Sequence, residues 1–233
     1  MSALDVSLVA GIPSFRGIEA ADLKQLLTDA RSRRYEKGEA IFNQGGDAHS
    51  FFLLLDGYVR VSRLTAEGDQ IIVRYICSGE LFGIAQALGL NKYPANAVAA
   101  VDCIVLSWSD NYWNVITKKH PTFATNTYQT VGARLQESQE RLVELSTERV
   151  EQRVANAVLN LAQQTGRKTD EGILIDFPIS RKDISEMTGT TLHTVSRLLS
   201  SWEQHGILTS ERKRITVLEG HQLAIIAAGD RSK

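Results

Sequence analysis

The sequence is poor in cysteine and contains no long apolar run. Cys77 and Cys103 are the two cysteines among 233 residues, too few for a disulfide framework, and no Cys-x-x-Cys pair offers a zinc site. We expect both to be small apolar side chains within β-structure, and a redox role has no support. No apolar run approaches the ~18 residues that cross a membrane. The start "MSALDVSLVAG" lacks the basic region of a secretory signal, so we expect a cytoplasmic protein with no membrane partner.

The sequence also lacks an excess of either charge and any motif of an enzyme. Its 26 basic and 27 acidic residues nearly cancel, which argues against a polycation but leaves room for a local basic face. The apolar fraction of 43% is ordinary for a soluble globular protein. We find no nucleophile elbow, P-loop, metal-ligand cluster or dinucleotide glycine fingerprint. The chain is therefore predicted not to be an enzyme.

Residues 1–120 are dominated by short strands punctuated by glycine. A helical lead-in is expected over residues 1–35, where apolar residues at helical spacing precede a basic end: Leu23, Leu26, Leu27, then Arg31, Arg33 and Arg34. "GYVRVSRL" and "DQIIVRYI" alternate with period two on either side of the turn "TAEG", and "AVAAVDCIVLSWS" is a further strand. This pattern favours a jelly roll over a parallel sheet. With the helices that follow, the chain is predicted to be α+β.

A helix with a heptad stripe is expected over residues 121–149. The stripe steps by three and four residues and consists of Ala124, Tyr128, Val131, Leu135, Ser138, Leu142 and Leu145. It is narrower than a core-facing helix needs, so we favour a dimer seam. The alternative is an amphipathic helix packed on its own domain. Dense charge in "STERVEQRV" predicts a hinge near Ser146–Val150.

Residues 150–233 have the layout of a helix-turn-helix followed by a β-hairpin. Ser180 and Asp183 form an N-cap signature for a first helix that ends near Met187. Gly189 lies in the turn, and Thr190 or Thr191 caps a second helix that runs to about His205. The predicted buried stripe of the second helix consists of Val195, Leu198, Leu199 and Trp202.

The second helix is predicted to contact DNA in the major groove. Arg197 can donate two hydrogen bonds to O6 and N7 of guanine. The other predicted contacts lie at the helix starts: Ser180, Thr191, His193, Thr194 and Ser196. A basic hairpin turn is expected to bind backbone phosphate through Arg212, Lys213 and Arg214.

With these parts in place, the chain resembles the Crp/Fnr superfamily of bacterial transcription regulators over nearly its whole length. The resemblance rests on "KGEAIFNQGGDAHSFFLLLDGYVRVSRLTAEGDQIIVRYICSGELFG", "RVANAVLNLAQQ" and "ISRKDISEMTGTTLHTVSRLLSSWEQHGIL". It implies an effector-sensing β-roll like the cyclic-nucleotide-binding fold (1–120), a dimerisation helix with a hinge (121–149) and a winged helix-turn-helix (150–233). It also implies a homodimer on palindromic double-stranded DNA, with RNA polymerase as a partner.

The effector region departs from the cyclic-nucleotide binders of that family. They carry a Gly-Glu pair after the Phe-x-Gly turn and an Arg-Ser pair further on, for ribose and cyclic phosphate. Here Ile84 follows Gly83, and the segment around Asn96 offers no arginine. We therefore expect neither cyclic AMP nor cyclic GMP as effector. Ser138 and Gln139 occupy helix positions that resemble the adenine-contacting ones. The resemblance implies an effector pocket lined by Gly83, Ile84, Asn96, Ser138 and Gln139.

Other members of the family sense oxygen through a four-iron–four-sulfur cluster, which needs four cysteines and is excluded by the two present. "TLHTVSRLL" and "YPANAVA" look most like the NnrR-type regulators of nitrogen-oxide metabolism. That resemblance implies activation of denitrification genes in response to nitric oxide. Haem is a candidate cofactor, with His49 and His120 as the first axial ligands to test. A constitutive DNA binder and a cyclic-nucleotide-responsive regulator are the alternatives.

His193 is the departure with the clearest consequence for DNA. Most family members hold a glutamate at this position, where it reads a G·C-containing pair. Because Ser196 and Arg197 are retained, an outer TTG…CAA-like signature is expected to survive. The inner base pairs are expected to be read loosely or differently.

Overall fold

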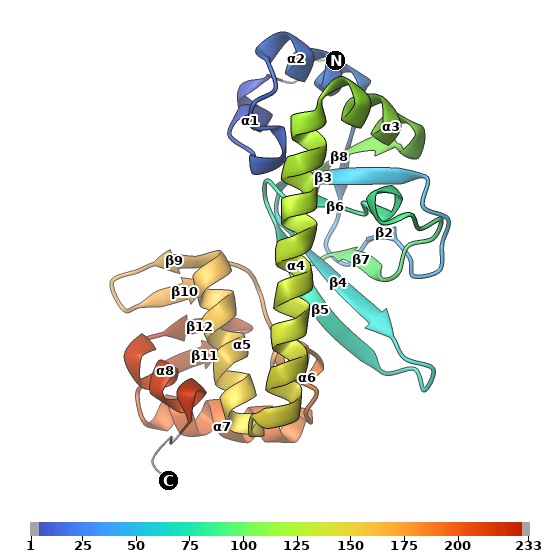
Figure 1. Cartoon of the computed structure of the whole chain (residues 1–233). Helices are drawn as coiled ribbons and strands as arrows, with labels where there is room; N and C mark the ends of the chain where they lie inside the picture. Colours follow the sequence, from blue (N-terminus) through green and yellow to red (C-terminus); the bar gives the residue numbers. More distant parts are fainter. Residues whose placement is uncertain (1–4, 230–233) are drawn as a thin grey trace. The chain divides into compact units, whose positions relative to one another are not determined.

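Two four-stranded antiparallel sheets, in the strand orders β1-β8-β3-β6 and β2-β7-β4-β5, build the roll of the N-terminal half (Figure 1). The strands are β1 (Arg31–Tyr35), β2 (Ala40–Phe42), β3 (Ser50–Asp56), β4 (Tyr58–Leu64), β5 (Gln70–Cys77), β6 (Leu81–Phe82), β7 (Asn96–Ala99) and β8 (Cys103–Ser109). The computed structural model describes residues 5–229, so the outermost residues of the predicted 1–120 and 150–233 domains lie outside the described range. The jelly-roll prediction is confirmed.

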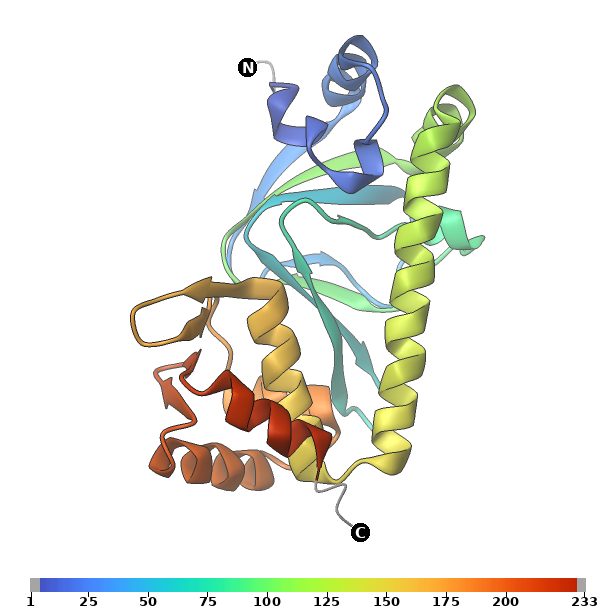
Figure 2. The ribbon, with the colours of Figure 1, turned by 60° about the vertical axis from the view of Figure 1, so that its left-hand side comes forward.

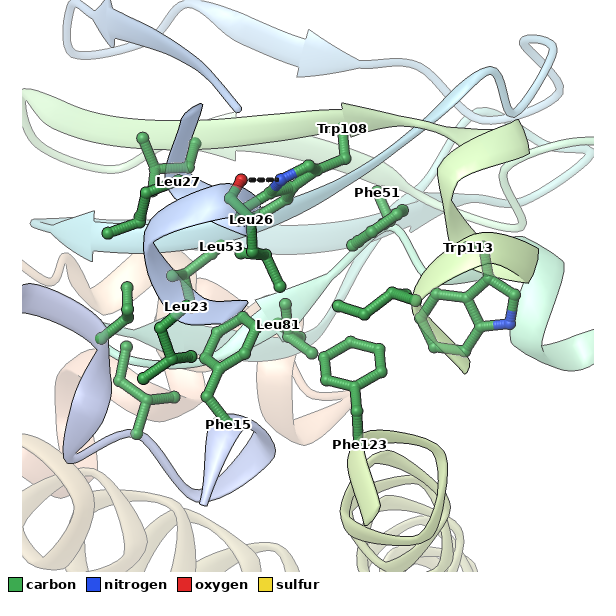
Figure 3. Close-up of a cluster of buried hydrophobic side chains, with 14 of the residues drawn as sticks. Phe15, Leu23, Leu26, Leu27, Phe51, Leu53, Leu81, Trp108, Trp113 and Phe123 are labelled. Carbon is green, nitrogen blue, oxygen red and sulfur yellow. Dashed lines mark hydrogen bonds between the residues drawn. The ribbon is translucent and has the colours of Figure 1, made fainter. Parts of the chain in front are cut away.

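One core of the roll joins the sheet β1-β8-β3-β6 to the helices at its end (Figure 3). These helices are α1 (Ser7–Ala10), the 3-10 helix η1 (Pro13–Phe15), α2 (Ala20–Asp29) and α3 (Asp110–Lys119). The predicted leucines of α2, Leu23, Leu26 and Leu27, are all buried in this core. The ring of Trp108 lies among them and donates a hydrogen bond from Nε1 to the carbonyl of Leu26 at 2.9 Å.

The basic end predicted for the lead-in helix is wrong. Arg31, Arg33 and Arg34 lie in β1 and pair with β8. The reason is that β1 is the edge of its sheet, where side chains face water and charged residues are tolerated. Two of these guanidiniums donate hydrogen bonds to carboxylates, Arg33 to the half-buried Glu39 and Arg34 to the exposed Asp102.

Both cysteines lie in strands, as predicted. Cys77 in β5 is half-buried and Cys103 in β8 is buried. Burial, with a smaller effect of the nearby Glu80 carboxylate, raises the pKa of Cys77 to about 11. Burial also raises the pKa of Cys103. Both thiols are therefore protonated at neutral pH.

The long helix α4 (Pro121–Thr147) has two apolar faces rather than one. Phe123 and Thr127 are fully buried, and Val131 packs against the core of the roll. The remaining bulky stripe residues are exposed, at 54% for Tyr128, 60% for Leu135, 65% for Leu142 and 43% for Leu145. Val131 thus belongs at least in part to the intradomain face, which was the alternative to a dimer seam. The face that carries Leu135 and Leu142 is not covered by the roll.

The chain forms two compact units: the first consists of the residues up to Leu64 and of Arg74–Glu137, and the second of Thr65–Val73 and the residues from Ser138 onward. The second unit holds the end of α4 and the C-terminal elements: α5 (Val150–Thr165), β9 (Gly166–Lys168), β10 (Ile173–Ile175), α6 (Arg181–Thr188), α7 (Leu192–Gln204), β11 (Leu208–Glu211), β12 (Arg214–Val217) and α8 (Gly220–Ala228). Its sheet has the order β11-β12-β10-β9. Helix α8 packs across α5 (Figure 2). Over residues 5–229, no helix is both long and apolar enough to cross a membrane.

Candidate nucleic-acid interface

The first helix of the predicted motif, α6, begins at a reciprocal cap. The Ser180 hydroxyl accepts a hydrogen bond from the Asp183 backbone N–H at 3.1 Å, and the Asp183 carboxylate accepts one from the Ser180 N–H at 2.8 Å. Two of the otherwise unsatisfied N–H groups at the helix start are thereby bonded. The N-cap prediction for Ser180 is confirmed. Its predicted DNA contact stays a prediction, because this hydroxyl already serves the cap.

The turn between α6 and α7 depends on one glycine and one threonine. Gly189 adopts a left-handed conformation, with φ 61°, that costs a residue with a side chain about 1 kcal/mol. Thr191 then caps α7, because its hydroxyl accepts a hydrogen bond from the Thr194 N–H at 3.1 Å. Of the two caps considered, Thr190 and Thr191, the structure has Thr191.

Helix α7 buries one face and exposes the face predicted to read DNA. Val195, Leu199 and Trp202 are buried, while the fourth predicted stripe residue, Leu198, is half-buried. On the other face, His193 and Arg197 are exposed, and Thr194 and Ser196 are half-buried at its flanks. The two exposed side chains are four residues apart, so they lie one above the other on the helix surface.

A further arginine, which no motif in the sequence marks, holds α6 against α7. Arg181 donates to the hydroxyl of Ser200 at 3.3 Å and to the carboxylate of Glu203 at 3.3 Å. It fixes the crossing of the two helices through polar contacts as well as through their apolar faces. The residues are 19 and 22 positions apart, and no local spacing indicates their contact.

The basic hairpin turn is present but smaller than predicted. Arg212 and Lys213 form a two-residue turn with φ 47° and 68°, the geometry of the tight hairpins that suit twisted strands. Arg214 lies in β12, paired with Glu211, so the prediction that it is part of the turn is wrong. All three basic side chains are exposed. The Lys213 carbonyl accepts a hydrogen bond from the Ile179 N–H at 2.8 Å, which ties the turn to the start of α6.

The residues predicted to line an effector pocket range from the buried core of the roll to the exposed surface of α4. Gly83 borders a group of stacked rings, and a Cβ built on it would lie 2.7 Å from Cδ2 of Phe52. Ile84 is buried in the core of the roll. The Asn96 side chain in β7 accepts a hydrogen bond from the Gln44 N–H at 2.9 Å. Ser138 and Gln139 are exposed on the part of α4 that belongs to the second unit. Their role as effector contacts stays a prediction.

A group of charged side chains, which no motif in the sequence marks, connects the roll to α4. Oε2 of Glu80 accepts hydrogen bonds from Nη2 of Arg74 and from Nη2 of Arg134, both at 3.0 Å. Arg134 also donates to the carbonyl of Leu81 at 2.7 Å. The three side chains are 30%, 22% and 19% exposed, respectively, so solvent screens them only in part. Burial, and next the nearby Arg74, lower the pKa of Arg134.

Haem ligation by His49 or His120 stays a prediction. His49 is exposed. Nδ1 of His120 lies 3.9 Å from the carboxylate of Asp22. An axial histidine requires an apolar pocket around the haem, which the exposed position of His49 does not provide. Across residues 5–229, no group of three or more histidine, cysteine or acidic residues is arranged to hold a metal ion.

Comparison with known proteins agrees with this arrangement of parts. Residues 32–120 match the cyclic nucleotide-binding domain, and residues 152–226 match the Crp-like helix-turn-helix domain. A roll of this type followed by a winged helix-turn-helix defines a DNA-binding transcription regulator. The chain belongs to the Crp/Fnr family of such regulators.

Individual relatives cover most of the chain. The Cyclic AMP receptor protein of Thermus thermophilus is 29% identical over 219 residues, which is 94% of this chain and 98% of that protein. The Fumarate and nitrate reduction regulatory protein of Salmonella typhimurium is 24% identical over 87% of this chain and 80% of its own length. The structure of FixK2 from Bradyrhizobium japonicum shares the fold, with a TM-score of 0.74 and 23% identity over 84% of this chain and 96% of that one.

Proposed function

We propose that the protein is a homodimeric regulator that binds palindromic DNA with a TTG…CAA-like outer signature and activates denitrification genes in response to nitric oxide. The proposal includes RNA polymerase as the partner that activation requires. Two copies of α7 would enter successive major grooves on one side of the duplex.

The observation that carries the DNA-binding part is the outward face of α7. Arg197 is exposed on a helix whose N-terminus is capped by Thr191 and whose opposite face is buried. A guanidinium in this position can reach O6 and N7 of a guanine. The exposed turn at Arg212 and Lys213 adds charge for the adjacent phosphates.

The dimer is supported by the exposed apolar face of α4. Leu135 and Leu142 are seven residues apart and more than half exposed in the single chain. That spacing returns to the same side of a helix in a coiled coil. A second copy of the helix would cover both residues, and the two-fold symmetry would match a palindrome.

The nitric-oxide part rests on the resemblance of "TLHTVSRLL" and "YPANAVA" to NnrR-type regulators. The most direct test is a gel shift with palindromic DNA, run without oxygen, with and without a nitric-oxide donor and haem. Binding that increases only with the donor supports the proposal. If haem carries the response, the Soret band must change in His49→Ala or His120→Ala, and an unchanged band in both removes these ligands.

A constitutive DNA binder is the second candidate, and the Glu80 contacts favour it specifically. The Glu80 carboxylate holds Arg74 and Arg134 together between the roll and α4, so the contact between these parts is made by the chain's own side chains. Full-strength binding by the purified protein, unchanged by a nitric-oxide donor, would support this candidate. Calorimetry with cyclic AMP separates both from a cyclic-nucleotide-responsive regulator, for which saturable heat is expected.

A further inference from the structure

The short break between α4 and α5 is a well-bonded segment of backbone rather than a loose hinge. Helix α4 ends at Thr147 and α5 begins at Val150, so the break lies within the predicted hinge at residues 146–150. The Glu148 N–H donates to the carbonyl of Glu144 at 2.9 Å, which continues the helical pattern. The Arg149 N–H donates to the side-chain oxygen of Gln152 at 3.0 Å, which caps the next helix.

One side chain, Arg153 in α5, joins this break to the helix-turn-helix. Its Nη1 donates to the carbonyl of Glu148 at 3.0 Å, and its Nε donates to the carbonyl of Thr188 at 3.3 Å. Glu148 lies just past the end of α4, and Thr188 is the last residue of α6. Carbonyls at helix ends lack intrahelical donors and carry the negative end of the helix dipole. A half-buried guanidinium is therefore well suited to bond both.

Two neighbouring contacts reinforce the same connection. Nδ2 of Asn156 donates to both carboxylate oxygens of Glu148, at 3.2 and 3.0 Å. Cδ2 of Leu145, in the last turns of α4, lies 3.7 Å from where a Cβ on Gly189 would be. The end of α4, the break and the turn that precedes α7 all belong to the second compact unit.

We infer that Arg153 is a positioning residue that sets the orientation of α7 relative to the end of the dimerisation helix, and thereby the spacing between half-sites that the dimer accepts. The inference rests on the proposed dimeric binding of a palindrome. In a two-fold dimer, the separation of the two reading helices depends on the path from the helix seam to α7. One added base pair shifts the second half-site by about 3.4 Å and turns it by about 35°. If the Arg153 bonds fix the orientation of α7, the dimer binds a site with one added base pair poorly. Without these bonds, α7 can shift to match the altered spacing.

The test measures affinity for palindromes in which the half-sites are separated by the best spacing or by one base pair more or less. The proteins are the wild type, Arg153→Gln, Arg153→Lys and a matched control, Arg167→Gln. Arg167 lies in the same unit and makes an exposed pair with Asp176, with Nε 3.3 Å from the carboxylate oxygen. A single half-site at high protein concentration reports on base reading by α7 alone.

We expect the wild type and Arg167→Gln to prefer the best spacing by at least about tenfold. In Arg153→Gln, the ratio of affinity at the best spacing to affinity at the altered spacings should fall to about two- or threefold. Its selectivity for a single half-site should be unchanged. Arg153→Lys, which offers one ammonium in place of the separate Nη1 and Nε donors, should fall between them. A purely structural role would weaken all spacings equally and leave the ratio intact.

The ratio also separates this inference from the proposed function. If the wild type binds no palindrome selectively, the proposed function fails. If the wild type shows a spacing preference that both Arg153 variants retain, the inference about Arg153 is overturned. If circular dichroism shows that Arg153→Gln does not fold, the affinity ratio of Arg153→Lys decides the inference instead.

Discussion

Arg134 on α4 and Glu80 in the roll are bonded across 3.0 Å, and the same carboxylate oxygen accepts a hydrogen bond from Arg74 at 3.0 Å. Burial and the neighbouring Arg74 both lower the pKa of Arg134, so the two guanidiniums are unfavourable partners for each other. The Glu80 carboxylate offsets that repulsion. It therefore couples the strand β6 region of the roll to the long helix.

Replacing Glu80 with glutamine should lower the free energy of unfolding by about 1–3 kcal/mol, since it leaves two partly buried guanidiniums without their shared carboxylate. Urea unfolding monitored by circular dichroism measures the loss. Asp176→Asn is the control, because its pair with Arg167 is exposed and should change stability by less than about 0.5 kcal/mol. Equal losses in the two variants would show that Glu80 has no special role.

The Cys77 thiol should resist alkylation in the folded protein. Burial, and next the Glu80 charge, raise its pKa from 9.0 to about 11. At pH 8 its thiolate fraction, and hence its reaction rate with iodoacetamide, should be roughly 100-fold below that of the unfolded chain. Peptide mass spectrometry follows the rate.

The same shift has a defined effect on stability. The folded thiol keeps its proton to higher pH than the unfolded thiol, so its contribution is full below pH 9.0 and is lost as the pH rises through about 11. Glu80→Gln should speed labelling of Cys77, because one cause of the raised pKa is removed. Labelling of the native wild type as fast as in urea would contradict this account.

Thr191→Ala should destabilise the second unit by about 1 kcal/mol, because the Thr194 N–H loses its capping acceptor. Thr190→Ala is a matched control, since it removes the same hydroxyl one position earlier, outside the cap. Thermal or urea unfolding separates them. If Thr190→Ala proves the more costly change, the capping assignment of α7 is incorrect.

Leu142→Glu should convert the proposed dimer to monomers at micromolar concentration, because it places two like charges across the seam. Val115→Glu, an equally apolar-to-acidic change at a site 55% exposed on α3, should leave the dimer intact. Sedimentation velocity gives the mass of each. A dimeric Leu142→Glu protein would place the dimer contact elsewhere.

Repeating patterns in the sequence predicted most of the fold, because those patterns reflect burial. Alternation in β4 and β5, the leucines of α2 and the Ser180 cap all correspond to local physics that a short window contains. The strand at Arg31–Tyr35 was missed because an edge strand exposes its side chains and so shows no alternation of apolar residues. The heptad stripe of α4 mixed two faces, since Val131 fits both a seam and the core of the roll.

The contacts between distant elements could not be predicted from local patterns in the sequence. Glu80 and Arg134 are 54 positions apart, and Arg153 meets the Thr188 carbonyl across 35 positions. Taken alone, Glu80, Arg134 and Arg153 are ordinary charged residues. Helix α5 has Arg153 as its single arginine, and α4 has Arg134 and Arg141, so no excess of charge marks these positions in the sequence.

The central claim is that α7 reads base pairs of a palindrome. The most direct test is the affinity of Arg197→Ala and His193→Glu for TTG…CAA-like sites and for sites with altered outer or inner base pairs. Fluorescence anisotropy at one fixed salt concentration measures these affinities. The account predicts a loss of about 1–3 kcal/mol per half-site in Arg197→Ala, with relaxed selectivity at the outer pairs. It predicts a narrower preference at the inner pairs in His193→Glu. Near-normal affinity and selectivity in Arg197→Ala would contradict it.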